Sequence, residues 1–227
     1  MFKKTLLVIA ILALATLAPI TAQENAEVSI IHGIPGENGL PVDVEVLGVG
    51  CIEDFTFGTV AGPLSLPPAT YTVSIKLPGM TACGGTTAIG PADIEFLAGE
   101  NASVIAHLTE TGDLTASKFT NDVSPTFLGQ SRLIARHTAA AGAVDISVDR
   151  GRGGSVTVSN VQNAQGVGYD VGSGRRWSIT LFDNASGAPV LGPAPVTLRA
   201  STVTILYALG DPAGGTFTVI ADSINLR

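Results

Sequence analysis

One sequence unit occurs twice in this chain of 227 residues, about a hundred residues apart. Residues 28–32 (VSIIH) lead through a loop into residues 42–46 (VDVEV), and residues 133–137 (LIARH) lead into residues 144–148 (VDISV). Each copy is an apolar stretch that ends in histidine, then a loop, then a Val-Asp pair that opens a second apolar stretch. Such a repeat predicts two domains of the same fold, because each copy must be one folding unit.

The residues that follow each unit alternate between apolar and polar side chains. This period of two, rich in Val, Ile, Thr and aromatic residues, is typical of strands. Tyr71 and Trp177 occupy matching positions, and residues 104–108 match residues 204–208, which sets His107 against Tyr207. Runs bounded by turn residues number about seven or eight per copy, which predicts an all-β chain of two antiparallel β-sandwiches. We expect domains over residues 23–124 and 125–227, joined near residues 121–129.

The start of the chain predicts export. Lys3 and Lys4 precede an uncharged apolar run over residues 6–18, and small residues follow up to Ala22. This order is that of a secretory signal peptide, here residues 1–22 with cleavage after Ala22. The run is shorter than the roughly 20 residues of a membrane span. We therefore expect a periplasmic or extracellular mature chain with no membrane span.

Both cysteines of the chain, Cys51 and Cys83, fall in the first copy. In an oxidising compartment a lone pair of cysteines forms a disulfide, whereas a metal site needs more ligands than these two. The composition, 45% hydrophobic and 14% charged, excludes a disordered chain.

The sequence resembles the DUF4397 family, a bacterial extracytoplasmic domain of unknown function. The resemblance is carried by residues 28–32, Pro35, residues 42–46 and residues 66–73 (LPPATYTV), and in the second copy by His137 and residues 144–148. The second copy departs from the Pro-containing segment at residues 173–177 (SGRRW). What the resemblance implies is two tandem copies of an exported immunoglobulin-like or transthyretin-like sandwich, with no established activity and no catalytic residues.

The repeated histidines and aspartates are the first candidates for chemistry. His32 and His137 end their strands on the face that should point to the core, while Asp43 and Asp145 have the opposite parity. We expect structural strand-end pairs, in which the histidine binds loop backbone groups. The alternative is a hydrolase or metal-dependent enzyme built on these positions. Because no GxSxG elbow and no zinc or calcium ligand spacing occurs, we expect no catalytic residues, no metal and no cofactor.

Charge separates the two halves. Residues 23–124 hold 13 acidic and 2 basic side chains, whereas residues 125–227 hold 6 acidic and 8 basic ones, all arginine. Arg150, Arg152, Arg175 and Arg176 fall in turns or at a strand start, where they form a candidate anion site. The alternative is a solvated surface without a partner. Candidate partners are an anionic polysaccharide, an envelope protein or another copy of the chain; compartment and acidity disfavour nucleic acid.

These observations favour a non-enzymatic binding, adhesion or structural module of the cell envelope or extracellular space. Loops at the ends of the sandwiches would form its contact surface.

Overall fold

The structure is a computed structural model that describes residues 23–36, 41–150, 154–174 and 176–226. The predicted signal peptide, residues 1–22, lies outside the described residues. The described chain is all β, with the following strands: β1 (Ala26–His32), β2 (Val42–Val46), β3 (Gly50–Phe55), β4 (Val60–Leu66), β5 (Ala69–Lys76), β6 (Thr87–Phe96), β7 (Asn101–Leu108), β8 (Leu114–Thr120), β9 (Gln130–His137), β10 (Val144–Asp149), β11 (Ser155–Val161), β12 (Gln165–Gly172), β13 (Arg176–Asp183), β14 (Pro189–Thr197), β15 (Thr202–Leu209) and β16 (Thr218–Asn225). A helix capable of crossing a membrane does not occur in this described part.

The first eight strands form a sandwich of two four-stranded sheets. One sheet has the order β4-β1-β7-β8 and the other β3-β2-β5-β6. Strands β1 and β7 run parallel, and the other neighbours are antiparallel. Between the sheets lies an apolar core that includes Val28, Ile30, Val44, Phe55 and Phe96.

The last eight strands repeat this topology. Their sheets have the orders β12-β9-β15-β16 and β11-β10-β13-β14, so each strand has a counterpart eight strands earlier. The prediction of an all-β chain with two sandwiches is confirmed. An immunoglobulin sandwich places its first strand beside its second, whereas β1 lies between β4 and β7 here. The strand order is therefore that of the transthyretin-like alternative.

The strand pairing corrects one match made from the sequence. His32 pairs with Ala106 in the first sandwich, and His137 pairs with Ala208 in the second. The counterpart of a β7 residue therefore lies 102 positions later in the sequence. Leu209 is the counterpart of His107, and Tyr207 is the counterpart of Ile105. A slip of two residues preserves the alternation of faces, so the apolar pattern alone does not detect it.

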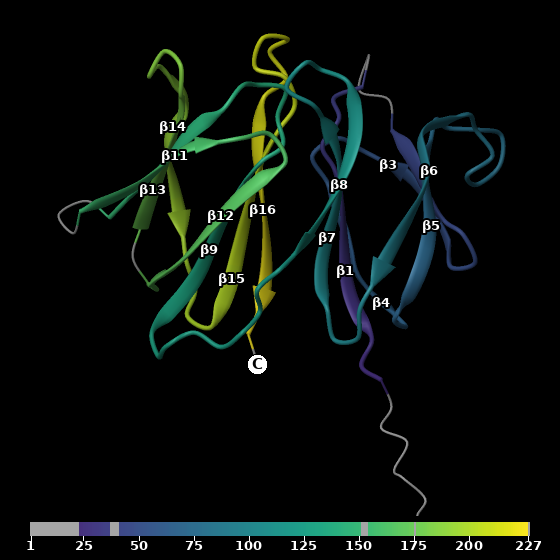
Figure 1. Cartoon of the computed structure of the whole chain (residues 1–227), viewed down its shortest axis with the longest axis horizontal. Helices are drawn as coiled ribbons and strands as arrows, with labels where there is room; N and C mark the ends of the chain where they lie inside the picture. Colours follow the sequence, from purple (N-terminus) through teal and green to yellow (C-terminus); the bar gives the residue numbers. More distant parts are fainter. Residues whose placement is uncertain (1–22, 37–40, 151–153, 175, 227) are drawn as a thin grey trace, which may run out of the picture.

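The two sandwiches pack on each other through the sheets that contain β1 and β9. In Figure 1 the four sheets follow one another across the view as four layers. The central strands β7, β9 and β15 are buried on both faces. One face of each contributes to an apolar cluster between the sandwiches, formed by Ile31, Ile105, Ile134, Val203, Ile205, Tyr207 and Leu209. We call this cluster the central layer.

Polar groups inside the central layer are hydrogen-bonded across it. The Tyr207 hydroxyl of the second sandwich donates to Ser103 Oγ of the first (2.7 Å), and Arg136 Nη1 donates to the Tyr207 oxygen (3.0 Å). Arg136 Nη2 donates to Asn121 Oδ1, and its guanidinium carbon lies 4.3 Å from the centroid of the Phe119 ring. Buried polar groups require such partners, so this network fixes how the two sandwiches meet.

Candidate functional site

The repeated histidines are buried at the ends of β1 and β9. His137 Nε2 donates to the carbonyl oxygens of Gly142 (2.9 Å) and Ala141 (3.2 Å). His32 Nδ1 accepts the backbone N–H of Ile34 (3.4 Å), and its Nε2 has no hydrogen-bond partner among the described residues. Burial lowers the pKa of His32 to about 4 and also lowers the pKa of His137. Both rings are therefore neutral at pH 7 and contact their own loops.

The repeated aspartates bind the backbone at irregular positions of the neighbouring strands. Asp43 accepts the N–H of Asp54 (3.2 Å), and Asp145 accepts the N–H of Asn160 (2.9 Å). Asp54 and Asn160 have left-handed φ angles of 52° and 61°, and each lies where the strand register shifts. Asp and Asn tolerate this conformation better than most residues. The Val-Asp pair thus stabilises a bulge, and neither aspartate has a hydrogen bond to the histidine of its own unit among the described residues.

Asp43 has a second role beneath the disulfide. The expected bond between Cys51 in β3 and Cys83 in the loop after β5 is present. The Cys83 N–H donates to Asp43 Oδ2 (3.2 Å), which leaves this aspartate only 4% exposed rather than at the solvent face. Candidate ligand atoms of Asp43, Cys51 and Cys83 lie within 4.8 Å of one another. Because the two sulfurs are bonded to each other, neither is a thiolate that binds metal.

The candidate arginine site is described in part. Arg150 extends from the end of β10, with its guanidinium carbon 5.8 Å from the centroid of the Trp177 ring. Arg152, Arg175 and the side chain of Arg176 lie outside the described residues. Arg132, which was not in the predicted set, forms ion pairs with Asp170 (2.8 Å) and with Asp122 at the end of the first sandwich (2.9 Å).

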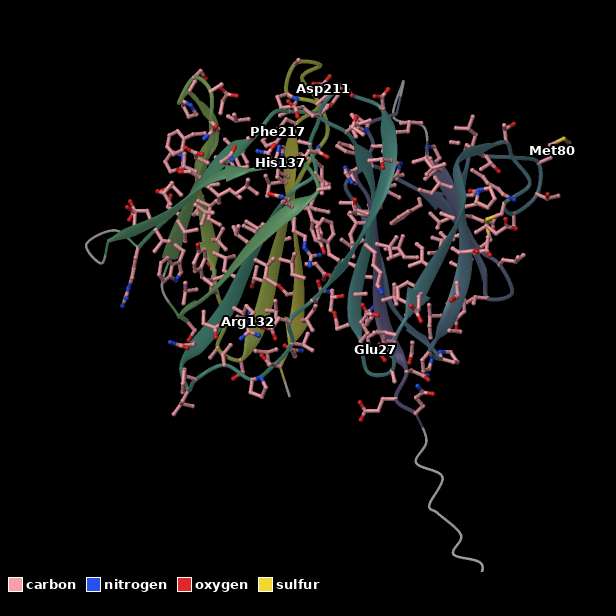
Figure 2. The ribbon with its side chains drawn as sticks, viewed as in Figure 1. Glu27, Met80, Arg132, His137, Asp211 and Phe217 are labelled. Carbon is pink, nitrogen blue, oxygen red and sulfur yellow. A yellow bond between two sulfur atoms is a disulfide. The ribbon has the colours of Figure 1, made fainter. Side chains whose placement is uncertain are left out.

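A large hollow opens at an edge of the second sandwich, between β14 and β16. We call it the β14–β16 cleft; its volume is about 550 Å³. Its floor is formed by core residues of the sandwich, including Ile146, Ile179 and Leu206, and Phe217 lies on its rim. Figure 2 labels Phe217 close to His137, near the end of β9, while Arg132 marks the beginning of that strand.

The described part of the first sandwich has no comparable space inside it. The hollow in its core measures about 50 Å³ and is lined by residues of both sheets, from Leu64 in β4 to Ile94 in β6. Part of the difference comes from side-chain size at equivalent positions. Ile30 fills the first sandwich where the second has Ala135, and Phe96 corresponds to Leu198. Smaller side chains leave space because the surrounding strands relax only partly.

A lysine covers the edge between β6 and β8 in the first sandwich. Lys118 in β8 lies 4.9 Å from the centroid of the Phe96 ring, donates to the carbonyl oxygen of Glu95 in β6 and forms an ion pair with Glu100 (2.8 Å). By the register its counterpart in β16 is Ala221, whose methyl group cannot reach β14. The first sandwich therefore has a side-chain bridge between its edge strands, and the second does not.

Two hydroxyl groups face the interior of the cleft. Thr204 in β15 and Ser223 in β16 are direct cross-strand partners and both line it. Within the described part of the chain, neither side-chain hydroxyl has a hydrogen-bond partner. The cleft, which Thr197, Thr218 and Arg136 also line, thus combines an apolar floor with a pair of adjacent hydroxyl groups on its interior face.

Comparison with known proteins places the chain in a family. Residues 26–147, just over half of the chain, match the family model described as "Domain of unknown function (DUF4397)". The chain belongs to the DUF4397 family. The match covers the first sandwich, continues through β9 and ends within β10, so it includes both repeated histidines and both aspartates. None of the curated proteins that were compared matches this DUF4397 protein.

Sequence reasoning did not find the cleft in this DUF4397 protein. The cleft is walled by β14 and β16, which follow the family match, and its lining consists of ordinary aliphatic residues without motif value. The available signal was the comparison of the two halves, where Ala135 and Ala221 replace Ile30 and Lys118. The repeated sequence unit already sets Ala135 against Ile30, whereas the match of Ala221 with Lys118 requires the strand register of the structure.

Proposed function

We propose that this protein is an exported, non-enzymatic binding protein that holds an apolar small molecule in the β14–β16 cleft. The observation that carries the proposal is the contrast between a hollow of about 550 Å³ in the second sandwich and one of about 50 Å³ in the first, although the two sandwiches have the same topology.

The size and chemistry of the cleft support this proposal. Small-molecule sites have volumes of roughly 300–1,000 Å³, are mostly apolar and carry a few placed polar groups. The cleft reaches core side chains, so an occupant would replace water on Ile146, Ile179 and Leu206. Thr204 and Ser223 are the placed polar groups on the interior face of the cleft.

The non-enzymatic part of the proposal is supported by the repeated unit. A general base must reach a substrate proton and have a suitable pKa. His32 and His137 are at most 2% exposed, and burial keeps the pKa of each below its ordinary value. The carboxylates of Asp43 and Asp145 are bound to backbone N–H groups. Hydrolytic or metal-dependent chemistry would need these groups to be released.

Export and duplication belong to the same proposal. The signal-peptide pattern over residues 1–22 and the Cys51–Cys83 disulfide favour a periplasmic or extracellular location. The identical sheet orders, together with the His and Asp at equivalent positions, favour two tandem copies of one DUF4397 domain. We infer that the copies diverged in role, and that the second became the ligand-binding one.

The chain contains a single tryptophan, which makes binding directly measurable. Trp177 belongs to the same core cluster as the cleft floor. A brominated long-chain alcohol bound in the cleft should quench its fluorescence, because bromine quenches on near contact. We expect saturable quenching for the wild-type protein and its loss in Ala135→Ile, which fills the interior.

The matched control is Thr157→Ile, which adds the same side chain to the outer face of the second sandwich. Thr157 in β11 is exposed and pairs with Ser147. We expect this variant to bind as the wild type does. Quenching that is absent in the wild type, or that survives unchanged in a folded Ala135→Ile protein, would contradict the proposed function.

A further inference from the structure

A second hollow opens at the opposite edge of the same sandwich, between β11 and β12. Its volume is about 240 Å³, and its lining includes Trp177, Tyr169 and Arg150. Ala135 and Ile146 line both this hollow and the β14–β16 cleft. The two hollows therefore approach each other inside the sandwich at these side chains of β9 and β10, which belong to opposite sheets.

The distance between the two mouths is set by the sheet. Four strands about 4.8 Å apart place the edge strands about 14 Å from each other. Because the side chains of the two sheets interdigitate across this space, a single linear hydrocarbon chain is the narrowest occupant that could join the two hollows. A molecule whose head group is held at the β11–β12 mouth directs such a chain toward the β14–β16 cleft.

The β11–β12 mouth differs from the other mouth in charge. Arg150 is exposed there, and its described interaction beyond the backbone is with the Trp177 ring. One acid lines this hollow, Asp170, and both of its oxygens accept hydrogen bonds from Arg132 Nε (2.8 Å) and Nη2 (3.1 Å). Among the described residues that line this hollow, the Asp170 charge is therefore compensated by Arg132, and Arg150 adds a positive charge.

The first sandwich lacks this arrangement. By the register of β2 and β10, the counterpart of Arg150 is Gly48, which has no side chain. The hollow inside the first sandwich, about 50 Å³, has no arginine, lysine or acid among the described residues of its lining. The arginine and the larger hollows thus occur together in the second sandwich.

The geometry points to an anionic amphiphile as the ligand, with its single hydrocarbon chain along the interior of the second sandwich and its carboxylate or sulfate head at Arg150. This inference rests on the proposed function and adds the head group and its direction. Arginine suits such a head because its planar fork donates two hydrogen bonds to one oxyanion. The exposed Tyr169 at the same mouth adds a hydroxyl donor beside it.

The test compares dodecanoate, dodecanol and dodecylamine, each at monomeric concentrations, by isothermal titration calorimetry with wild type, Arg150→Gln and Arg199→Gln. Arg199 is an exposed arginine in the turn after β14 that does not line the hollow, so Arg199→Gln is the control for loss of one charge. For the wild type we expect dodecanoate to bind more tightly than dodecanol, and dodecylamine more weakly. Arg150→Gln should weaken dodecanoate about five- to tenfold, leave dodecanol unchanged and abolish the preference.

The outcomes separate this inference from the proposed function. Equal binding of dodecanoate and dodecanol by the wild type, or equal weakening of both by Arg150→Gln, overturns the head-group assignment while chain binding stands. A preference lost equally in Arg199→Gln also overturns it, because net charge would then be the cause. If none of the three compounds binds, both the inference and the proposed function fail.

Discussion

Replacing Ala135 by isoleucine should stabilise this protein, although the position lies in a core strand. Ala135 is 7% exposed and lines both hollows of the second sandwich. The substitution adds three carbon atoms, and burial of each contributes about 0.8 kcal/mol, or about 2.4 kcal/mol in all. Fixing the new side chain costs about 0.5–1 kcal/mol. The expected net gain is about 1.5 kcal/mol, which for a chain of this size raises Tm by about 3–6 °C.

The reverse substitution at the equivalent position of the first sandwich should destabilise the protein. Ile30 occupies the equivalent position in the closed first sandwich and is also 7% exposed. Ile30→Ala should lower the free energy of unfolding by about 2–5 kcal/mol, because it leaves a cavity in a filled core. Urea unfolding followed by far-ultraviolet circular dichroism measures both variants under the same conditions. If Ala135→Ile destabilises the protein by more than about 1 kcal/mol, the interior has no room for the side chain and the argument for the cleft is refuted.

Three further predictions concern charged and buried polar groups. Lys118→Ala should cost about 2 kcal/mol of unfolding free energy at pH 7 through loss of its ion pair and ring contact. Hydrogen bonds to the Glu100 carboxylate outweigh burial and lower the pKa of Glu100, so the cost measured by urea unfolding should shrink as pH falls through that pKa. A cost that stays constant with pH would exclude the ion pair as its cause. His32 has a pKa of about 4 in the folded protein, whereas in the unfolded chain it takes up a proton near pH 6.5. Stability should therefore fall by up to about 1.4 kcal/mol per pH unit as pH drops from 6.5 toward 4. His32→Gln should flatten this pH dependence, and an unchanged slope would assign the dependence to other groups. Asn121→Ala removes a hydrogen-bond acceptor of Arg136 and should lower the free energy of unfolding by about 2 kcal/mol. In differential scanning calorimetry the unfolding transition should occur at a lower temperature or split in two. An unaltered thermogram would show that the network does not couple the sandwiches.

The repeated unit predicted the two sandwiches because it combines strand alternation with duplication, and both are local properties of the sequence. The role of Asp43 was harder to predict. Its parity pointed to the solvent side of the sheet, yet a register shift in β2 and the disulfide-linked loop bury it. Bulges and loop contacts depend on chain segments far apart in the sequence, which periodicity does not describe.

The central layer could have been suspected from β7 and β15. Residues 203–209 (VTILYAL) form a nearly continuous apolar run, which is typical of strands buried on both faces. The cleft carried no comparable signal. Empty space in a core arises where side chains are too small to fill it, and a small side chain is not unusual in a sequence by itself. Ala135 is an unremarkable residue until Ile30 is known to be its counterpart.

Because of the central layer, the repeated half of this protein is not the same as its stable folding unit. The sequence repeat predicts a division near residues 121–129, but Ile105 of one half and Tyr207 of the other are both fully buried by the contact between the halves. Either half produced alone would present a whole sheet face of isoleucine, valine and tyrosine to water and would be prone to aggregate. The repeated unit is therefore only half of the unit that buries this face, and truncation at the linker is a poor route to isolating the second sandwich.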